Sequence, residues 1–126
     1  MRKKAIDMSK LMIVYIPSSV TSIEDESFKY CNLLTRIVIP QSVKLIKNKA
    51  FYKCTNLMEI TIDPFSSKVE IDSFLNCSSL NHLIIGESAK TIKQYDFNKF
   101  NQIKRITIPN TVTKFENKSF YSLKSL

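Results

Sequence analysis

The fold is decided by residues 34–57, which read LTRIVIPQSVKLIKNKAFYKCTNL. The first 23 residues of this stretch form a unit that recurs along the chain without insertion or deletion. The recurrence is clearest in one column of phenylalanines, which are Phe28, Phe51, Phe74, Phe97 and Phe120. Further apolar columns keep the same phase. A unit this short cannot enclose a core alone, so its apolar positions must be covered by those of the next unit, which predicts a solenoid.

The pattern within each unit predicts a short strand followed by a turn. Ile37 and Ile39 alternate with exposed positions, as in a strand with one buried face, and Pro40 ends that strand because proline cannot donate to a sheet. The later spacing of three between Phe51 and Cys54 suggests a single helical or 3₁₀ turn. The predicted fold class is therefore α/β. We expect a solenoid with short parallel strands on the concave face and turns or short helical segments on the convex side.

The same columns set the expected domain organisation. Residues 11–126 are predicted to form one domain of about five repeats, which start near residues 11, 34, 57, 80 and 103. Residues 1–10 match the end of a repeat only loosely and are predicted to form a degenerate N-terminal cap.

Two segments resemble a known family. Residues 39–46 (IPQSVKLI) and 50–57 (AFYKCTNL) are similar to the BspA-like leucine-rich repeat, in which an IP-x-SV-x-x-I run precedes AF-x-x-C. The resemblance extends from Leu11 to Leu126. Asp63 and Gly86 depart from it, since both stand where the repeat has proline. The resemblance implies a non-catalytic binding scaffold from a family associated with protein binding and cell-surface adhesion.

Charge and hydropathy exclude several partner classes. The net charge is +8, from 19 Lys and Arg against 11 Asp and Glu, but the lysines are scattered over every repeat. Without a basic helix or a phosphate-binding glycine loop, nucleic acid is not expected as a partner. No run approaches the ~20 apolar residues of a membrane helix. No leader is recognisable, so a cytoplasmic location is expected, or the cell surface if the chain is a fragment.

No catalytic, metal or cofactor site is predicted. Cys31, Cys54 and Cys77 are separated by whole repeats, whereas metal ligands come in closely spaced pairs, so these thiols are predicted to be buried apolar groups. His82 is the one histidine, and no nucleophile lies at a fixed offset from it. We therefore expect His82 to be solvated and the chain not to be an enzyme.

The candidate partner-binding residues lie between the buried strand positions and should point outward from the concave face. They are Tyr15, Arg36, Val38, Glu59, His82, Ile84 and Arg105. Solenoids use such faces to bind proteins. Ordinary pairing between neighbouring strands accounts for the same residue types, so both interpretations stay open.

The C-terminal end is a second candidate surface, because the repeat stops there without a recognisable cap. Its apolar residues are Ile108, Val112, Phe115, Phe120, Leu123 and Leu126. Open strand edges pair with other chains, which predicts a homo-oligomer. If repeats are missing from a longer protein, they would cover this surface instead. The predicted function is thus a self-associating protein-interaction scaffold, and the alternative is an adhesion module of a longer secreted protein.

Overall fold

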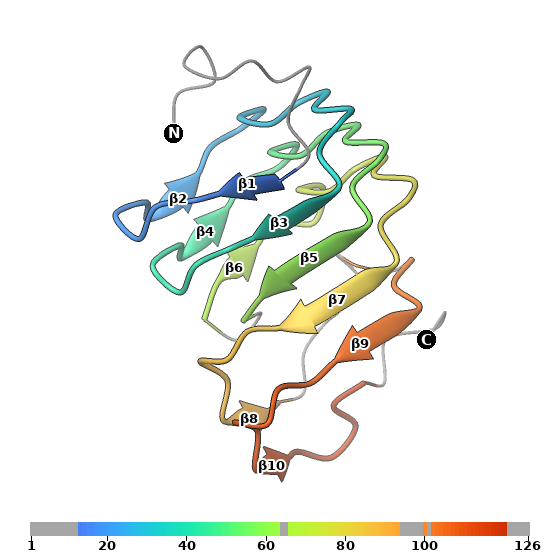
Figure 1. Ribbon diagram of the computed structural model, residues 1–126. Coiled ribbons are helices and arrows are strands. Elements are labelled where there is room, and N and C mark those ends of the chain that lie inside the picture. Colours follow the sequence, from blue (N-terminus) through green and yellow to red (C-terminus); the bar gives the residue numbers. More distant parts are fainter. Residues whose placement is uncertain (1–12, 64–65, 94–99, 101, 121–126) are drawn as a thin grey trace.

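A computed structural model describes residues 13–63, 66–93, 100 and 102–120, in which parallel strands stack into a solenoid (Figure 1). The strands are β1 (Ile13–Tyr15), β2 (Ser22–Ile23), β3 (Arg36–Val38), β4 (Leu45–Ile46), β5 (Glu59–Ile62), β6 (Lys68–Val69), β7 (His82–Ile85), β8 (Thr91–Ile92), β9 (Arg105–Thr107) and β10 (Lys114–Phe115). One sheet has the order β1-β3-β5-β7-β9. The smaller sheets are β2-β4-β6 and β8-β10.

Strand pairing follows the repeat. Each residue of the five-stranded sheet pairs with the residue one repeat later, so Ile37 lies beside Ile60 and Ile60 beside Leu83. These three side chains are at most 1% exposed, as are Leu34 and Leu57 where each repeat begins. Burial of like columns on one another confirms the predicted leucine-rich-repeat solenoid with parallel strands. The predicted N-terminal cap lies outside the described residues.

The helical half of the predicted fold class is not confirmed. Among the described residues the strands are joined by turns, in which Ser27 N–H donates to Glu24 at 3.2 Å and Lys29 N–H to Glu26 at 3.2 Å. Glu26 has a φ of 61° and Tyr30 a φ of 62°. Left-handed residues cannot continue a right-handed helix, so each turn is interrupted before a helix can form.

The turns are held to one another by backbone bonds and by stacked rings. Phe28 N–H donates to the Ala50 carbonyl of the next repeat at 2.8 Å. The Phe51 ring lies between Phe28 and Phe74, with centroid distances of 5.0 and 4.9 Å. Phe97, which belongs to the same column, lies outside the described residues. The turns of the first described repeats are therefore stacked in the same order as the strands of the sheet.

The cysteine column has the predicted structural role. Cys31, Cys54 and Cys77 are reduced and at most 1% exposed. The thiol of Cys54 donates to the Phe28 carbonyl at 3.0 Å, and Cys77 repeats this contact with Phe51 at 3.0 Å. The thiols of Cys54 and Cys77 thus satisfy a carbonyl of the preceding turn while filling a small apolar site.

Candidate functional site

The outward face of the five-stranded sheet, called the sheet face below, brings the predicted binding residues together (Figure 1). Its two columns of neighbouring residues are Ile13, Arg36, Glu59, His82 and Arg105, and Tyr15, Val38, Thr61, Ile84 and Thr107. All seven residues predicted to bind a partner belong to these columns. Since strands pair in strict register, the sequence spacing was enough to assign them to one face.

The upper part of the sheet face is apolar and open to solvent. Tyr15 is 76% exposed and Val38 is 43% exposed, and the two residues are paired between β1 and β3. Ile84, two strands beyond Val38, is half-buried. Adjacent exposed apolar side chains of this kind are typical of surfaces that bind other proteins.

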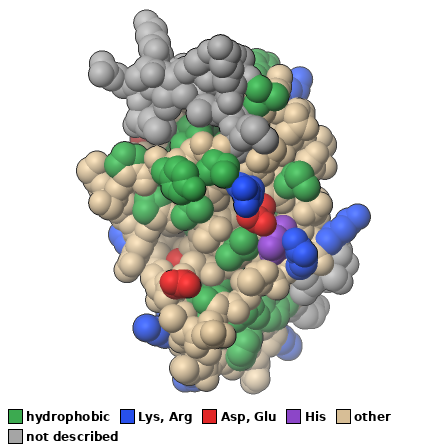
Figure 2. Space-filling model, in the orientation of Figure 1, with side chains coloured by type: hydrophobic (Ala, Val, Ile, Leu, Met, Phe, Trp, Pro, Cys, Tyr) green, Lys and Arg blue, Asp and Glu red, His purple; other side chains and the backbone are tan. Residues whose placement is uncertain are grey.

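His82 differs from its prediction, because it is only 7% exposed rather than solvated. Its Nδ1 lies 3.0 Å from Glu59 Oε1 and 3.0 Å from the Arg105 guanidinium, and its Nε2 lies 2.7 Å from the Thr107 hydroxyl. In Figure 2 the histidine sits among acidic and basic side chains on this face. The long side chains of the neighbouring strands flank the imidazole and bury it. This burial cannot be seen in a column of sequence positions.

Glu59, His82 and Thr107 are arranged in the order of a catalytic triad, which consists of an acid, a base and a hydroxyl nucleophile. A histidine that accepts the hydroxyl proton becomes an imidazolium. Arg105 and Glu59 place opposite charges at the same distance of 3.0 Å from Nδ1 of this ring, so the ring is not paired with an acid alone. Donation from Arg105 to Nδ1 also favours the tautomer with hydrogen on Nε2, which donates to Thr107 rather than accepting its proton. The arrangement fits a structural polar network better than a catalytic one.

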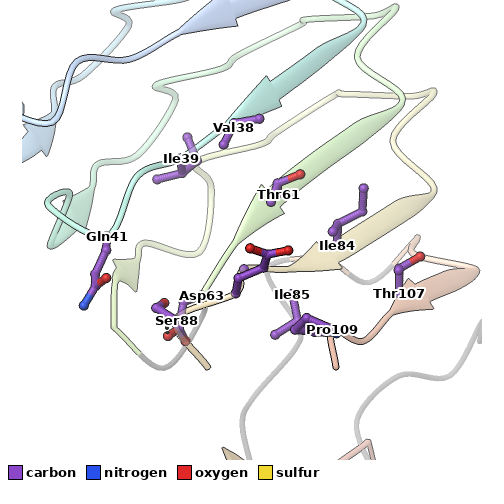
Figure 3. Close-up of a pocket in the computed structure, with 12 residues that line it drawn as sticks. Val38, Ile39, Gln41, Thr61, Asp63, Ile84, Ile85, Ser88, Thr107 and Pro109 are labelled. Carbon is purple, nitrogen blue, oxygen red and sulfur yellow. Dashed lines mark hydrogen bonds between the residues drawn. The ribbon is translucent and has the colours of Figure 1, made fainter. Parts of the chain in front are cut away.

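A groove lies where the strands of the sheet face end, and it is called the strand-end groove below (Figure 3). Its volume is about 510 Å³. It is lined by Val38, Ile39, Gln41, Thr61, Asp63, Ile84, Ile85, Gly86, Glu87, Ser88, Thr107 and Pro109. Val38, Thr61, Ile84 and Thr107 stand on four successive strands in Figure 3, so the groove crosses the sheet. Sequence reasoning did not predict it.

The groove contains both departures from the proline column. Asp63 is 8% exposed, and its Oδ2 accepts hydrogen bonds from Ser66 at 2.9 Å and Ser88 at 2.8 Å. Gly86 N–H donates to the Ile62 carbonyl at 2.9 Å, a bond that proline could not make. A Cβ on Gly86 would meet the Asp63 nitrogen at 3.3 Å. Asp63 and Gly86 were the signal in the sequence from which the groove could have been predicted. They bring a carboxylate and a close backbone contact to adjacent strand ends.

The predicted self-association surface is only partly described. Phe115 is 56% exposed, and its ring lies 6.5 Å from that of Phe120. Ile108, Val112 and Phe120 are half-buried against the core. Leu123 and Leu126 lie outside the described residues. The apolar columns are therefore less buried at the last described strands than in the middle of the stack.

The described part of the chain has neither a cluster of metal ligands nor a membrane-spanning helix. Within it, no three histidine, cysteine or acidic side chains are grouped so that they could hold a metal ion. Over the same residues, no helix has both the length and the apolar character needed to cross a membrane.

Comparison with known proteins identifies the repeat. A family model described as the BspA type leucine rich repeat region matches residues 1–126 in six copies. A leucine-rich repeat protein from Bacteroides ovatus is similar in structure, with 24% identity and a TM-score of 0.55. A leucine rich cell surface protein from Faecalibacterium prausnitzii has 22% identity and a TM-score of 0.45. The chain is covered to 89% and 91%, but it spans only 28% and 35% of those two proteins. No curated protein matches by sequence.

Proposed function

We propose that this chain, which belongs to the BspA-type leucine-rich-repeat family, is a protein-interaction scaffold that binds its partner on the sheet face. The observation that carries the proposal is the pairing of Tyr15 with Val38, two apolar side chains that are 76% and 43% exposed. Tyrosine supplies a large contact area at a low cost in side-chain entropy, and it is enriched among the residues that dominate binding energy. A flat sheet of short strands presents these residues with little rearrangement.

Beside them runs a column of polar residues, Arg36, Glu59, His82 and Arg105. We expect this column to orient the partner rather than to increase the affinity for it. Arg36 and Arg105 are exposed, whereas His82 and Glu59 are held between them. Hydrogen bonds within this column limit the rotamers that its members sample, so a partner would meet a surface that is already ordered.

The proposal can be tested with a matched pair of surface variants. Tyr15→Glu combined with Val38→Glu places charge on the sheet face, and Leu33→Glu changes a side chain of similar exposure, 44%, outside it. Immobilised wild-type protein and both variants are exposed to lysate of the source cells, and captured proteins are quantified by isotope labelling. We expect at least one protein to be retained by wild type and Leu33→Glu but lost from the double variant. Equal capture by all three would contradict the assignment to this face.

Self-association through the C-terminal strands is a second proposal, which the 56% exposure of Phe115 supports. This apolar ring on β10, which pairs with β8, would be covered by a second copy of the chain. Light scattering at micromolar to millimolar concentration should give a mass above that of the monomer for wild type and the monomer mass for Phe115→Asp. Ile71→Asp, at a side chain 59% exposed elsewhere, is the control and should leave the mass of the assembly unchanged. A monomeric wild type would end this proposal.

The alternative setting is a module of a cell-surface adhesion protein, which the family association supports. Brief protease treatment of intact source cells distinguishes the two settings. Release of peptides from this chain without lysis would favour adhesion, and their complete protection would favour an internal scaffold.

A further inference from the structure

We propose that the strand-end groove receives a lysine or arginine side chain from an extended segment of the partner protein. This inference rests on the proposed function and names the chemistry of the partner. The groove and the chain as a whole differ in charge. The chain carries a net charge of +8, with 19 Lys and Arg, yet none of the described residues that line the groove is basic. The charged residues that do line it are Asp63 and Glu87.

Two serine hydroxyls help to orient the Asp63 carboxylate. Its Oδ2 accepts bonds from the hydroxyls of Ser66 and Ser88, and the residue is 8% exposed. Hydroxyl donors fix the direction of a carboxylate without cancelling its charge. In the low dielectric of a nearly buried site, that charge attracts a cation more strongly than it would in water. Glu87 is exposed at the same strand end and adds a second negative charge.

The walls of the groove favour a cation with an aliphatic stem over a bare ion. Val38, Ile84, Ile85 and Pro109 contribute apolar surface to it. Lysine and arginine cover apolar surface with their methylene groups and carry the charge at the tip. A metal ion would leave these walls unused, and no group of metal ligands occurs among the described residues.

The shape of the groove fits an extended segment. It reaches across β3, β5, β7 and β9, whose separations of about 4.8 Å amount to about 14 Å in all. That distance corresponds to about four residues of extended peptide. Val38 belongs both to the groove and to the exposed part of the sheet face, so one partner segment could contact both.

The test uses three synthetic pentapeptides, acetyl-Ala-Val-X-Val-Ala-amide, in which X is lysine, norleucine or glutamate. Each is titrated into ¹⁵N-labelled full-length protein at low salt, and amide shifts are followed by NMR. We expect the lysine peptide to shift the amides of Thr61, Ile84 and Ser88 and to bind at least fivefold more tightly than the norleucine peptide. Raising the salt concentration should remove most of this preference.

Variants of the groove separate charge from shape. Asp63→Asn with Glu87→Gln keeps side-chain volume and should abolish the preference for lysine, whereas Asp25→Asn, at an exposed carboxylate outside the groove, should retain it. If the double variant does not fold, Glu87→Gln alone should reduce the preference at least twofold. Equal binding of the lysine and norleucine peptides, no shifts at millimolar peptide, or an undiminished preference in the folded groove variants would overturn the inference.

Failure of the groove inference can be distinguished from failure of the proposed function. If the double variant at Tyr15 and Val38 loses a captured partner while the groove variants keep it and the lysine peptide does not bind, only the groove inference fails. If the lysine peptide binds as expected but the Tyr15 and Val38 variant captures every protein that wild type does, the assignment of the sheet face fails instead.

Discussion

Asp63 and Ser88, which lie in neighbouring repeats, are joined by a hydrogen bond of 2.8 Å from the serine hydroxyl to Oδ2 of the carboxylate. The bond connects the strand ends at which the proline column is interrupted. A nearly buried carboxylate is costly unless donors surround it, and Ser88 provides one of them from the next repeat. The pair therefore contributes to cohesion between repeats as well as to the form of the strand-end groove.

Ser88→Ala should lower the free energy of unfolding by about 1.5–3 kcal/mol, because it removes a donor from a charged acceptor with little access to water. Urea denaturation measures the change. Ser78→Ala, at an exposed serine, is the control and should stay within about 0.5 kcal/mol of wild type. A Ser88→Ala protein as stable as the control would show that Asp63 does not depend on this bond.

Phe51→Ala should cost about 3–5 kcal/mol, since its ring is fully buried and stacks on both Phe28 and Phe74. Phe51→Leu should cost less, because leucine fills part of the space and loses only the ring contacts. Thermal unfolding followed by circular dichroism ranks the two. If leucine proved as damaging as alanine, stacking geometry rather than filled volume would dominate this column.

Burial of Cys54 predicts a loss of stability in alkaline solution. The neighbouring Cys31 lowers the pKa of Cys54, but Cys77 and burial outweigh this effect and raise the pKa from 9.0 to about 12. Above pH 9 the thiol ionises in the unfolded chain and stays protonated in the fold, so the folded state binds more protons. The stabilisation is complete below pH 9 and is lost as pH rises towards 12, by about 1.4 kcal/mol per pH unit.

Urea denaturation of wild type and Cys54→Ala at pH 8, 9, 10 and 11, with a reductant present, isolates this contribution. The variant starts from lower stability because it leaves a cavity, but its stability should fall less steeply with pH. Identical slopes would mean that the thiol ionises alike in the folded and unfolded states.

Arg105→Met should change the tautomer of His82. In the wild-type protein the guanidinium lies 3.0 Å from Nδ1 and favours hydrogen on Nε2. Without that donor, Glu59 can accept a hydrogen from Nδ1, to which its carboxylate already lies at 3.0 Å. Long-range proton–nitrogen correlation spectra distinguish the two tautomers. Arg36→Met is the control, and an Nδ1 tautomer already present in wild type would refute the proposed role of Arg105.

The repeat in the sequence was sufficient to predict the solenoid and most of its core. Apolar columns in constant phase leave one way to bury Ile37, Phe51 and Leu57, which is against their own counterparts one repeat away. The same phase placed Tyr15 and Val38 on one face, because parallel strands pair in register and their side chains alternate. The buried role of the cysteines followed from their place in an apolar column.

Features that depend on contacts between repeats could not be predicted in this way. The left-handed backbone at Glu26 and Tyr30, which keeps the expected turns from continuing as a helix, has no glycine to announce it. The burial of His82 depends on the side chains above and below it, and the groove depends on Asp63 meeting Gly86 across a repeat boundary. The sequence thus determined which residues stack, since that is set by periodic burial. Only the tertiary structure decided where the stack departs from its repeat, because those departures arise from packing between particular side chains in neighbouring repeats.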